Sequence, residues 1–95
     1  MNCNKNIKTV ENVCYTVGEK NLSFTFADKY ETEQDAVEAI QKVYKDGTGF
    51  QYDEYMIYRE VWNRSTKDGY TIKESRSLTA QRIVRKDGTQ TLCVF

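Results

Sequence analysis

Three carboxylates stand near the most aromatic part of the sequence: Asp53, Glu54 and Glu60. Two such groups facing one cleft could serve as the acid and base of glycoside hydrolysis. A chain of 95 residues has little volume in which to build that cleft, so we interpret all three as solvated charges at strand ends. The sequence also lacks histidine, which removes imidazole acid–base chemistry and His-dependent triads. We therefore predict that the chain is not an enzyme and has no catalytic residues.

Cysteine and serine offer little more chemistry. The three cysteines, Cys3, Cys14 and Cys93, form no C-x-x-C pair, and a structural zinc normally takes four Cys or His ligands. We interpret Cys14 and Cys93 as small apolar residues inside strands and Cys3 as part of a loose end. The serines stand in no nucleophile-elbow motif, and there is no glycine-rich phosphate loop. No metal and no cofactor are predicted.

Arginine is the most unevenly distributed residue type. Lys and Arg balance Asp and Glu at fourteen each, but residues 1–48 carry a net charge of −2 and residues 49–95 a net charge of +2. All five arginines follow residue 58, and the segment from Ser75 to Lys86 contains three of them and no acid. Arginine binds carboxylate or phosphate through a planar fork and stacks on aromatic rings. The second half of the chain is therefore where we expect a binding surface.

Six residues form the candidate partner-binding set: Tyr55, Tyr58, Trp62, Arg76, Arg82 and Arg85. Three interpretations remain open. The rings could simply be core and the arginines a solvated face. Alternatively, Tyr, Trp and Arg are the residue types enriched at protein-interface hot spots. In the third interpretation, the rings stack the bases of a single-stranded nucleic acid while the basic segment from Arg76 to Lys86 holds its phosphates.

The elements that must position these residues begin with a β-hairpin. From Ile7 the chain is extended, and Val13, Tyr15 and Val17 share one parity. A turn is expected at residues 18–21, followed by a second strand over residues 22–26 in which Leu22, Phe24 and Phe26 alternate with polar residues. An amphipathic helix then begins after Thr32 as N-cap and ends before Gly47. Its apolar stripe is expected to cover the hairpin; the stripe consists of Ala36, Val37, Ile40, Val43 and Tyr44.

The aromatic stretch from Tyr52 to Asn63 favours a strand, although Tyr55, Tyr58 and Trp62 would also fit one face of a helix. After a polar connection over residues 64–69 and a short extended piece over residues 70–74, a closing hairpin is expected between residues 78 and 95. Its turn is Lys86-Asp87-Gly88, with Gly88 in a bulge and Arg85 facing Thr89. That register places Leu78, Ala80, Val84, Leu92 and Val94 on one side, with Arg82 among them.

The predicted fold is α+β: an antiparallel sheet in the order β-β-α-β-β-β with one amphipathic helix on one face. Residues 1–6 are expected to be frayed, and residues 7–95 to form a single domain. The sequence has no proline, so exposed strand edges would rely on charges or on a bound partner. No apolar run is long enough for a membrane span, and the amino terminus lacks the apolar stretch of a signal peptide, so we expect a cytoplasmic protein with no membrane partner.

In size and in its lack of catalytic groups the chain resembles small accessory proteins of bacteria or phages, which act by binding and blocking a larger machine. This likeness covers no motif and enters by analogy. The leading hypothesis is a non-catalytic module that binds a protein partner through a sheet face or an exposed edge, with a homodimer among the expected assemblies. The alternative is a domain that binds single-stranded nucleic acid.

Overall fold

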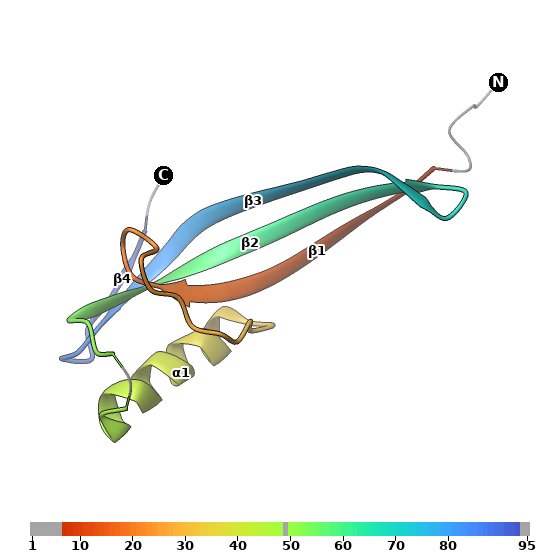
Figure 1. Ribbon diagram of the computed structural model, residues 1–95. Helices are drawn as coiled ribbons and strands as arrows, with labels where there is room; N and C mark the ends of the chain where they lie inside the picture. The colour runs from red at the N-terminus through yellow and green to blue at the C-terminus, as the bar shows by residue number, and fades with distance from the viewer. Residues whose placement is uncertain (1–6, 49, 94–95) are drawn as a thin grey trace.

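One helix and four strands make up the described part of the chain, residues 7–48 and 50–93 of a computed structural model (Figure 1). In chain order they are β1 (Ile7–Gly18), α1 (Glu33–Asp46), β2 (Glu54–Lys67), β3 (Tyr70–Arg85) and β4 (Gln90–Leu92). All pairings are antiparallel, and the sheet order is β1-β2-β3-β4. The α+β class is confirmed. The residues predicted to be frayed, 1–6 with Cys3, lie outside the described residues.

Helix α1 begins and ends where its sequence predicts. The Thr32 hydroxyl accepts the backbone N–H of Asp35 at 3.1 Å, which satisfies one of the free donors of the first turn. At the other end, the N–H of Gly47 donates to the carbonyl of Val43. Between these caps the predicted apolar stripe faces the sheet, and Ile40 is fully buried.

The core lies between α1 and one face of the sheet (Figure 1). Its fully or nearly fully buried members are Val17, Ala36, Val37, Ile40, Tyr55, Ile57 and Val84. Residues paired directly across antiparallel strands share a face, so the pair Val17 and Ile57 marks the face that α1 covers. We call this the covered face and the other the open face. The strand prediction for the aromatic stretch is confirmed, with Tyr55 and Ile57 on the covered face and Tyr58 and Trp62 on the open face.

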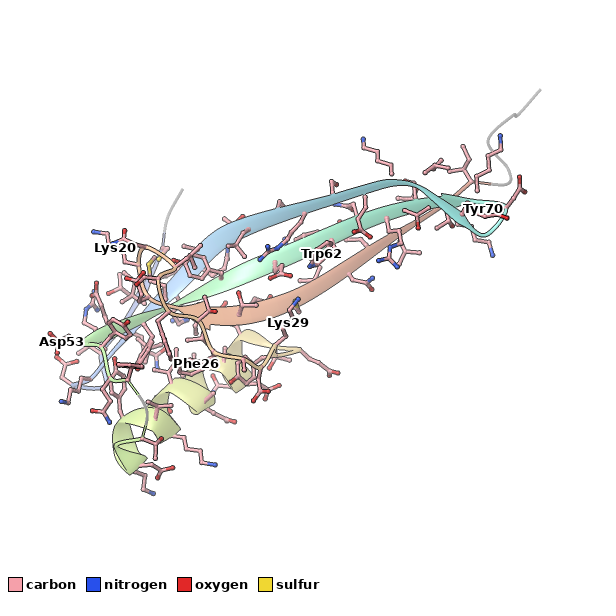
Figure 2. All side chains as sticks on the ribbon, viewed as in Figure 1. Lys20, Phe26, Lys29, Asp53, Trp62 and Tyr70 are labelled. Atoms are coloured by element: carbon pink, nitrogen blue, oxygen red, sulfur yellow. The ribbon has the colours of Figure 1, made fainter. Side chains whose placement is uncertain are left out.

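The predicted second strand over residues 22–26 is wrong. The chain runs along the outer edge of β1 but makes only two isolated bridges, Gly18 with Thr25 and Tyr15 with Tyr30. The order is therefore β-α-β-β-β. Aromatic packing competes with ladder pairing here: Phe26 lies between the sheet and α1 and packs its ring edge-on against Tyr55 (Figure 2). The rings that alternate in the sequence thus fill the margin of the core instead of one strand face.

The connection predicted over residues 64–69 is also wrong, because β2 continues to Lys67. A two-residue turn at Asp68 and Gly69, with φ of 53° and 81°, leads directly into β3. Two positive φ angles define the hairpin turn whose twist matches the flanking strands. The long strands extend as a three-stranded arm beyond α1, with Tyr70 at its tip (Figure 2). The radius of gyration is consequently 17.1 Å, whereas a compact chain of this length would have about 12 Å.

The closing hairpin has the predicted turn. Gly88 adopts a φ of 88°, and the backbone N–H of Arg85 donates to the carbonyl of Thr89 at 2.9 Å. The prediction that the apolar residues of this hairpin share one face is wrong, because β3 contains a bulge. Ile57 pairs with Arg82 but Tyr58 with Ala80, so Gln81 is an extra residue in β3. Leu78 and Ala80 therefore lie on the open face, opposite to Val84 and Leu92. Val94 lies outside the described residues.

Candidate functional site

The open face carries a buried carboxylate at its centre. Glu60 of β2 is 1% exposed, and its two oxygens accept hydrogen bonds from three side chains. Lys29 donates at 3.1 Å from the loop before α1, Arg76 donates at 3.0 Å from β3, and the indole N–H of Trp62 donates from the same strand as Glu60. The strand period of two places Glu60 and Trp62 on one face, and the register sets Arg76 directly beside Trp62. We call these four residues the Glu60 cluster.

Electrostatics keep Glu60 ionised. Burial raises the pKa of Glu60, but the hydrogen bonds from Trp62 and Lys29 and the charge of Arg76 outweigh it, so the pKa lies below its ordinary value near 4.5. The two cations are about half exposed, at 57% for Lys29 and 49% for Arg76. Because one buried carboxylate faces two cations, the Glu60 cluster presents a net charge of +1 to solvent.

The indole of Trp62 is held by the same cations. The Lys29 ammonium lies 5.7 Å from the ring centroid and the Arg76 guanidinium 5.6 Å, both within the range of a cation–π contact. Figure 2 labels Trp62 and Lys29, which come from the strand and from the loop before α1. The ring is half-buried, so part of it stays available to solvent.

A cavity of about 240 Å³ adjoins the Glu60 cluster. Its lining consists of Thr16, Leu22, Thr25, Phe26, Ala27, Lys29, Glu60, Trp62, Arg76 and Leu78. More of the wall is apolar than polar, and Lys29, Arg76 and Glu60 supply its charged part. Cavities that take a drug-sized molecule usually measure about 300–1,000 Å³, so this one suits a side chain better than a whole small molecule.

The structure brings together only two of the six predicted site residues, Trp62 and Arg76. Tyr55 is fully buried in the core, with its ring against Phe26 and Tyr44, so it presents no surface to a partner. Tyr58 is 7% exposed, and its hydroxyl donates to the carbonyls of Glu19 and Lys20 at 3.2 and 3.3 Å. Both rings therefore stabilise the fold.

The other two arginines serve separate contacts. Arg82 lies on the covered face, as its predicted register required, and pairs with Glu33 at the start of α1. Arg85 lies near Glu54, with 3.7 Å between the charged atoms, and donates to the Thr91 hydroxyl at 2.6 Å. Nine residues of strand separate Arg85 from Arg76, which corresponds to about 30 Å. The basic segment of the sequence is thus not a continuous basic patch.

Sequence reasoning missed two members of the Glu60 cluster. Glu60 was expected to be a solvated strand-end charge, but it is buried in the middle of β2, the second strand of the sheet. One signal was available: a carboxylate flanked at i−2 and i+2 by Tyr58 and Trp62 must share their face. Lys29 gave no signal, because its contact with Glu60 spans 31 residues of sequence and because it lies in the segment between residues 22–26, where a strand was wrongly predicted, and α1.

A second hollow, of about 750 Å³, lies between α1 and the loop before it. Its aromatic wall includes Phe24 and Phe50, and its charged residues, Asp28, Lys42 and Asp46, are exposed and of mixed sign. Phe24 and Phe50 pack against each other at 5.8 Å between ring centroids. The hollow therefore lacks the convergent charges found at the Glu60 cluster.

Comparisons with known proteins identify no relative: no family model matches the chain, and no curated protein or solved structure matches it significantly. Within residues 7–48 and 50–93, no set of three or more Cys, Asp or Glu side chains is arranged to hold a metal ion. Cys14 and Cys93 are free thiols, each half-buried. No helix in the same part of the chain has the length and apolar character to cross a membrane.

Proposed function

We propose that the chain is a small, non-catalytic binding module that receives a protein partner on its open face. The observation that carries this proposal is the cavity beside the Glu60 cluster, because it combines an apolar wall with two half-exposed cations. Trp and Arg are the residue types that most often dominate binding energy at protein interfaces. The partner surface that fits is an apolar side chain next to an acidic one: the first enters the cavity and the second pairs with Arg76 or Lys29.

The chemistry of Glu60 supports binding over catalysis. A general acid needs a carboxyl group whose pKa is raised toward the working pH, whereas the pKa of Glu60 is lowered and both of its oxygens are occupied. The carboxylate instead orients Trp62, Lys29 and Arg76 in fixed positions. Preorganised side chains lose less entropy when a partner binds, so such a cluster favours affinity.

Single-stranded nucleic acid is the second candidate, favoured by Trp62 and Arg76 lying together, since bases stack on indole rings while arginine holds phosphate. The separation of Arg76, Arg82 and Arg85 weighs against it, because a strand-tracking groove needs continuous positive charge. By analogy with small bacterial and phage proteins, the partner would be a larger machine that this module blocks. That role and the cytoplasmic location stay predictions.

A displayed library of random peptides, selected against the wild-type chain, tests the proposal. Peptides that bind the wild type are synthesised with a fluorescent label and titrated by fluorescence anisotropy, because W62A removes the single tryptophan of the chain. We expect an apolar residue beside Asp or Glu in the selected peptides, and an affinity at least about fivefold weaker for W62A and R76A, because hot-spot truncations typically cost more than 1 kcal/mol. R85A is the matched control, since Arg85 lies far from the cavity, and its affinity should equal that of the wild type.

The same titration with a 15-nucleotide oligo(dT) at low and moderate salt addresses the alternative. Saturable binding that weakens steeply with salt, together with no selected peptide, would replace protein binding by nucleic-acid binding. Peptides that bind W62A and R76A as well as the wild type would overturn the proposed site. Circular dichroism of each variant confirms that the loss is not one of folding.

A further inference from the structure

In the part of the chain that the structure describes, the outer edge of β3 is unpaired along the arm. Between Tyr70 and Ala80, β3 pairs with β2 on one side, while β4 pairs only with residues 82–84. Residues 71–77 are all exposed, and among the described residues no strand lies on the outer side of this stretch, which forms one border of the arm (Figure 1). Ile72 is an extra residue of β3, because Ser65 pairs with Lys73 and Thr66 with Thr71, so the regular exposed stretch runs from Lys73 to Ser77 and measures about 17 Å. An edge of this length without proline is a template for pairing with another strand.

The register shows which backbone groups point outward. The backbone N–H of Arg85 donates to the carbonyl of Thr89, on the β4 side of β3. Because Arg85 pairs with Glu54 across the sheet, its side chain lies on the open face. In a regular strand, residues whose side chains share a face direct their N–H and C=O groups to the same neighbour. Glu74 and Arg76 lie on the open face, since they pair with Arg64 and Trp62. Their backbone groups therefore point to the uncovered edge.

We propose that a second copy of this chain pairs antiparallel with this edge, with Ser75 on the two-fold axis. A symmetric antiparallel pairing matches residues whose numbers have a constant even sum. Centred on Ser75, it sets Glu74 opposite Arg76 of the second copy and Arg76 opposite Glu74. It also sets Lys73 opposite Ser77, so no like charges meet across the edge.

Neighbouring registers lack this complementarity. A centre on Glu74 or on Arg76 would place like charges directly opposite each other, which destabilises a sheet. A centre on Lys73 would pair two lysines, and a centre on Ser77 would leave Glu74 and Arg76 facing uncharged residues. The register centred on Ser75 is therefore the one that charge selects.

Existing ion pairs extend across the junction. Within one copy, Arg64 lies 2.7 Å from Glu74, and Arg76 lies 3.0 Å from Glu60. Pairing at Ser75 joins these into a row of alternating charges running from Arg64 and Glu74 of one copy to Arg76 and Glu60 of the other. The two open faces then form one surface with two Trp62 cavities. This deepens the proposed function but needs no partner, so it can be tested separately.

Cysteine cross-linking tests the register. In a symmetric pairing centred on Ser75, the two copies of residue 75 form a pair without backbone hydrogen bonds, with Cα atoms about 4.5 Å apart, which a disulfide can bridge. We expect S75C to form a covalent dimer under mild oxidation. S77C is the matched control, because its two copies would be about 13 Å apart at four residues of strand, and it should stay monomeric. The wild type measures any linkage through its own cysteines.

Sedimentation equilibrium gives the second readout. The wild-type mass should rise from 11.1 kDa toward twice that value with concentration. E74K places a lysine opposite Arg76 at both ends of the junction and should weaken the dimer about tenfold or more. K73E is the control, since Lys73 faces Ser77 and its reversal opposes no like charge. W62A with S75C should still cross-link, which separates this inference from peptide binding.

Three results would overturn the proposal. The first is a wild-type mass that stays at 11.1 kDa up to millimolar concentration. The second is equal cross-linking of S75C and S77C, which would indicate random collision. The third is a mass that grows beyond two chains, which would indicate head-to-tail pairing of β3 with the β1 edge instead of a closed dimer.

Discussion

Replacing Glu60 by Gln is the most informative perturbation of the open face. The carboxylate is 1% exposed and accepts three hydrogen bonds, two of them from cations. A hydrogen bond to a charged group contributes about 1.5–3 kcal/mol, but Lys29 and Arg76 are half exposed and regain water when the charge is lost. We expect E60Q to lower the free energy of unfolding by about 2 kcal/mol. With a urea m-value of about 1 kcal/mol/M, the midpoint would move by about 2 M.

The matched control is E54Q. The Glu54 carboxylate lies 3.7 Å from the Arg85 guanidinium. The Glu54 side chain is 44% exposed and that of Arg85 34%, whereas Glu60 is 1% exposed. An exposed pair of this kind contributes about 0–1 kcal/mol. Urea unfolding of both variants at pH 7 is the assay. If E60Q unfolds at the same urea concentration as E54Q or the wild type, the buried Glu60 cluster does not stabilise the chain.

The pH dependence of E60Q gives an independent sign test. The pKa of Glu60 is lowered in the folded state, so the unfolded chain binds more protons between the two pKa values. The stabilisation is therefore fully present above the ordinary value near 4.5 and is lost as the pH falls through the lowered pKa. The gap in stability between wild type and E60Q should shrink from pH 6 to pH 3. A constant gap over that range would show that the charge of Glu60 does not contribute.

Three further perturbations test the placement of other residues. Y55A should lower the free energy of unfolding by about 3–5 kcal/mol, because Tyr55 is fully buried, and W62A by no more than about half of that. Thermal or urea unfolding measures both, and equal losses would place Trp62 in the core. T32A removes the hydroxyl that accepts the Asp35 N–H and should cost about 1 kcal/mol, and unchanged stability would show that this cap is not formed in solution. Burial raises the pKa of Tyr44 well above its ordinary value of 10, so the free energy of unfolding should fall as the pH rises past 10, and less steeply in Y44F. Alkaline unfolding of the wild type and Y44F is followed by circular dichroism. Identical curves would contradict the burial of the Tyr44 hydroxyl.

The sequence predicted best where local chemistry decides structure. The helix from Glu33 to Asp46 follows from its capping residue and apolar spacing, and the closing turn follows from Lys86-Asp87-Gly88. Both depend on residues within a few positions of one another. The prediction for residues 64–67 was wrong because their polar side chains are typical of a loop. These residues continue β2 instead, since Asp68 and Gly69 form a tight turn directly after them.

The candidate site was harder to predict because it depends on contacts between distant segments. Trp62 and Arg76 were both selected by residue type, and the register of β2 with β3 brings them together. Tyr55 and Tyr58 were selected by residue type as well, but both are buried, because an aromatic side chain fits a core as well as an interface. Glu60 was assigned to solvent because a lone carboxylate usually lies there, whereas its burial depends on cations from other segments, Lys29 31 residues away and Arg76 on β3.

Binding of a partner on the open face beside the Glu60 cluster can be followed residue by residue. Amide chemical-shift mapping with a peptide selected against the wild type tests it most directly. We expect the largest shifts at the Trp62 indole N–H, Lys29, Arg76 and Leu78, which surround the cavity. Shifts confined to the other hollow, at Phe24, Val43 and Phe50, would contradict binding on the open face and place the binding site between α1 and the loop before it.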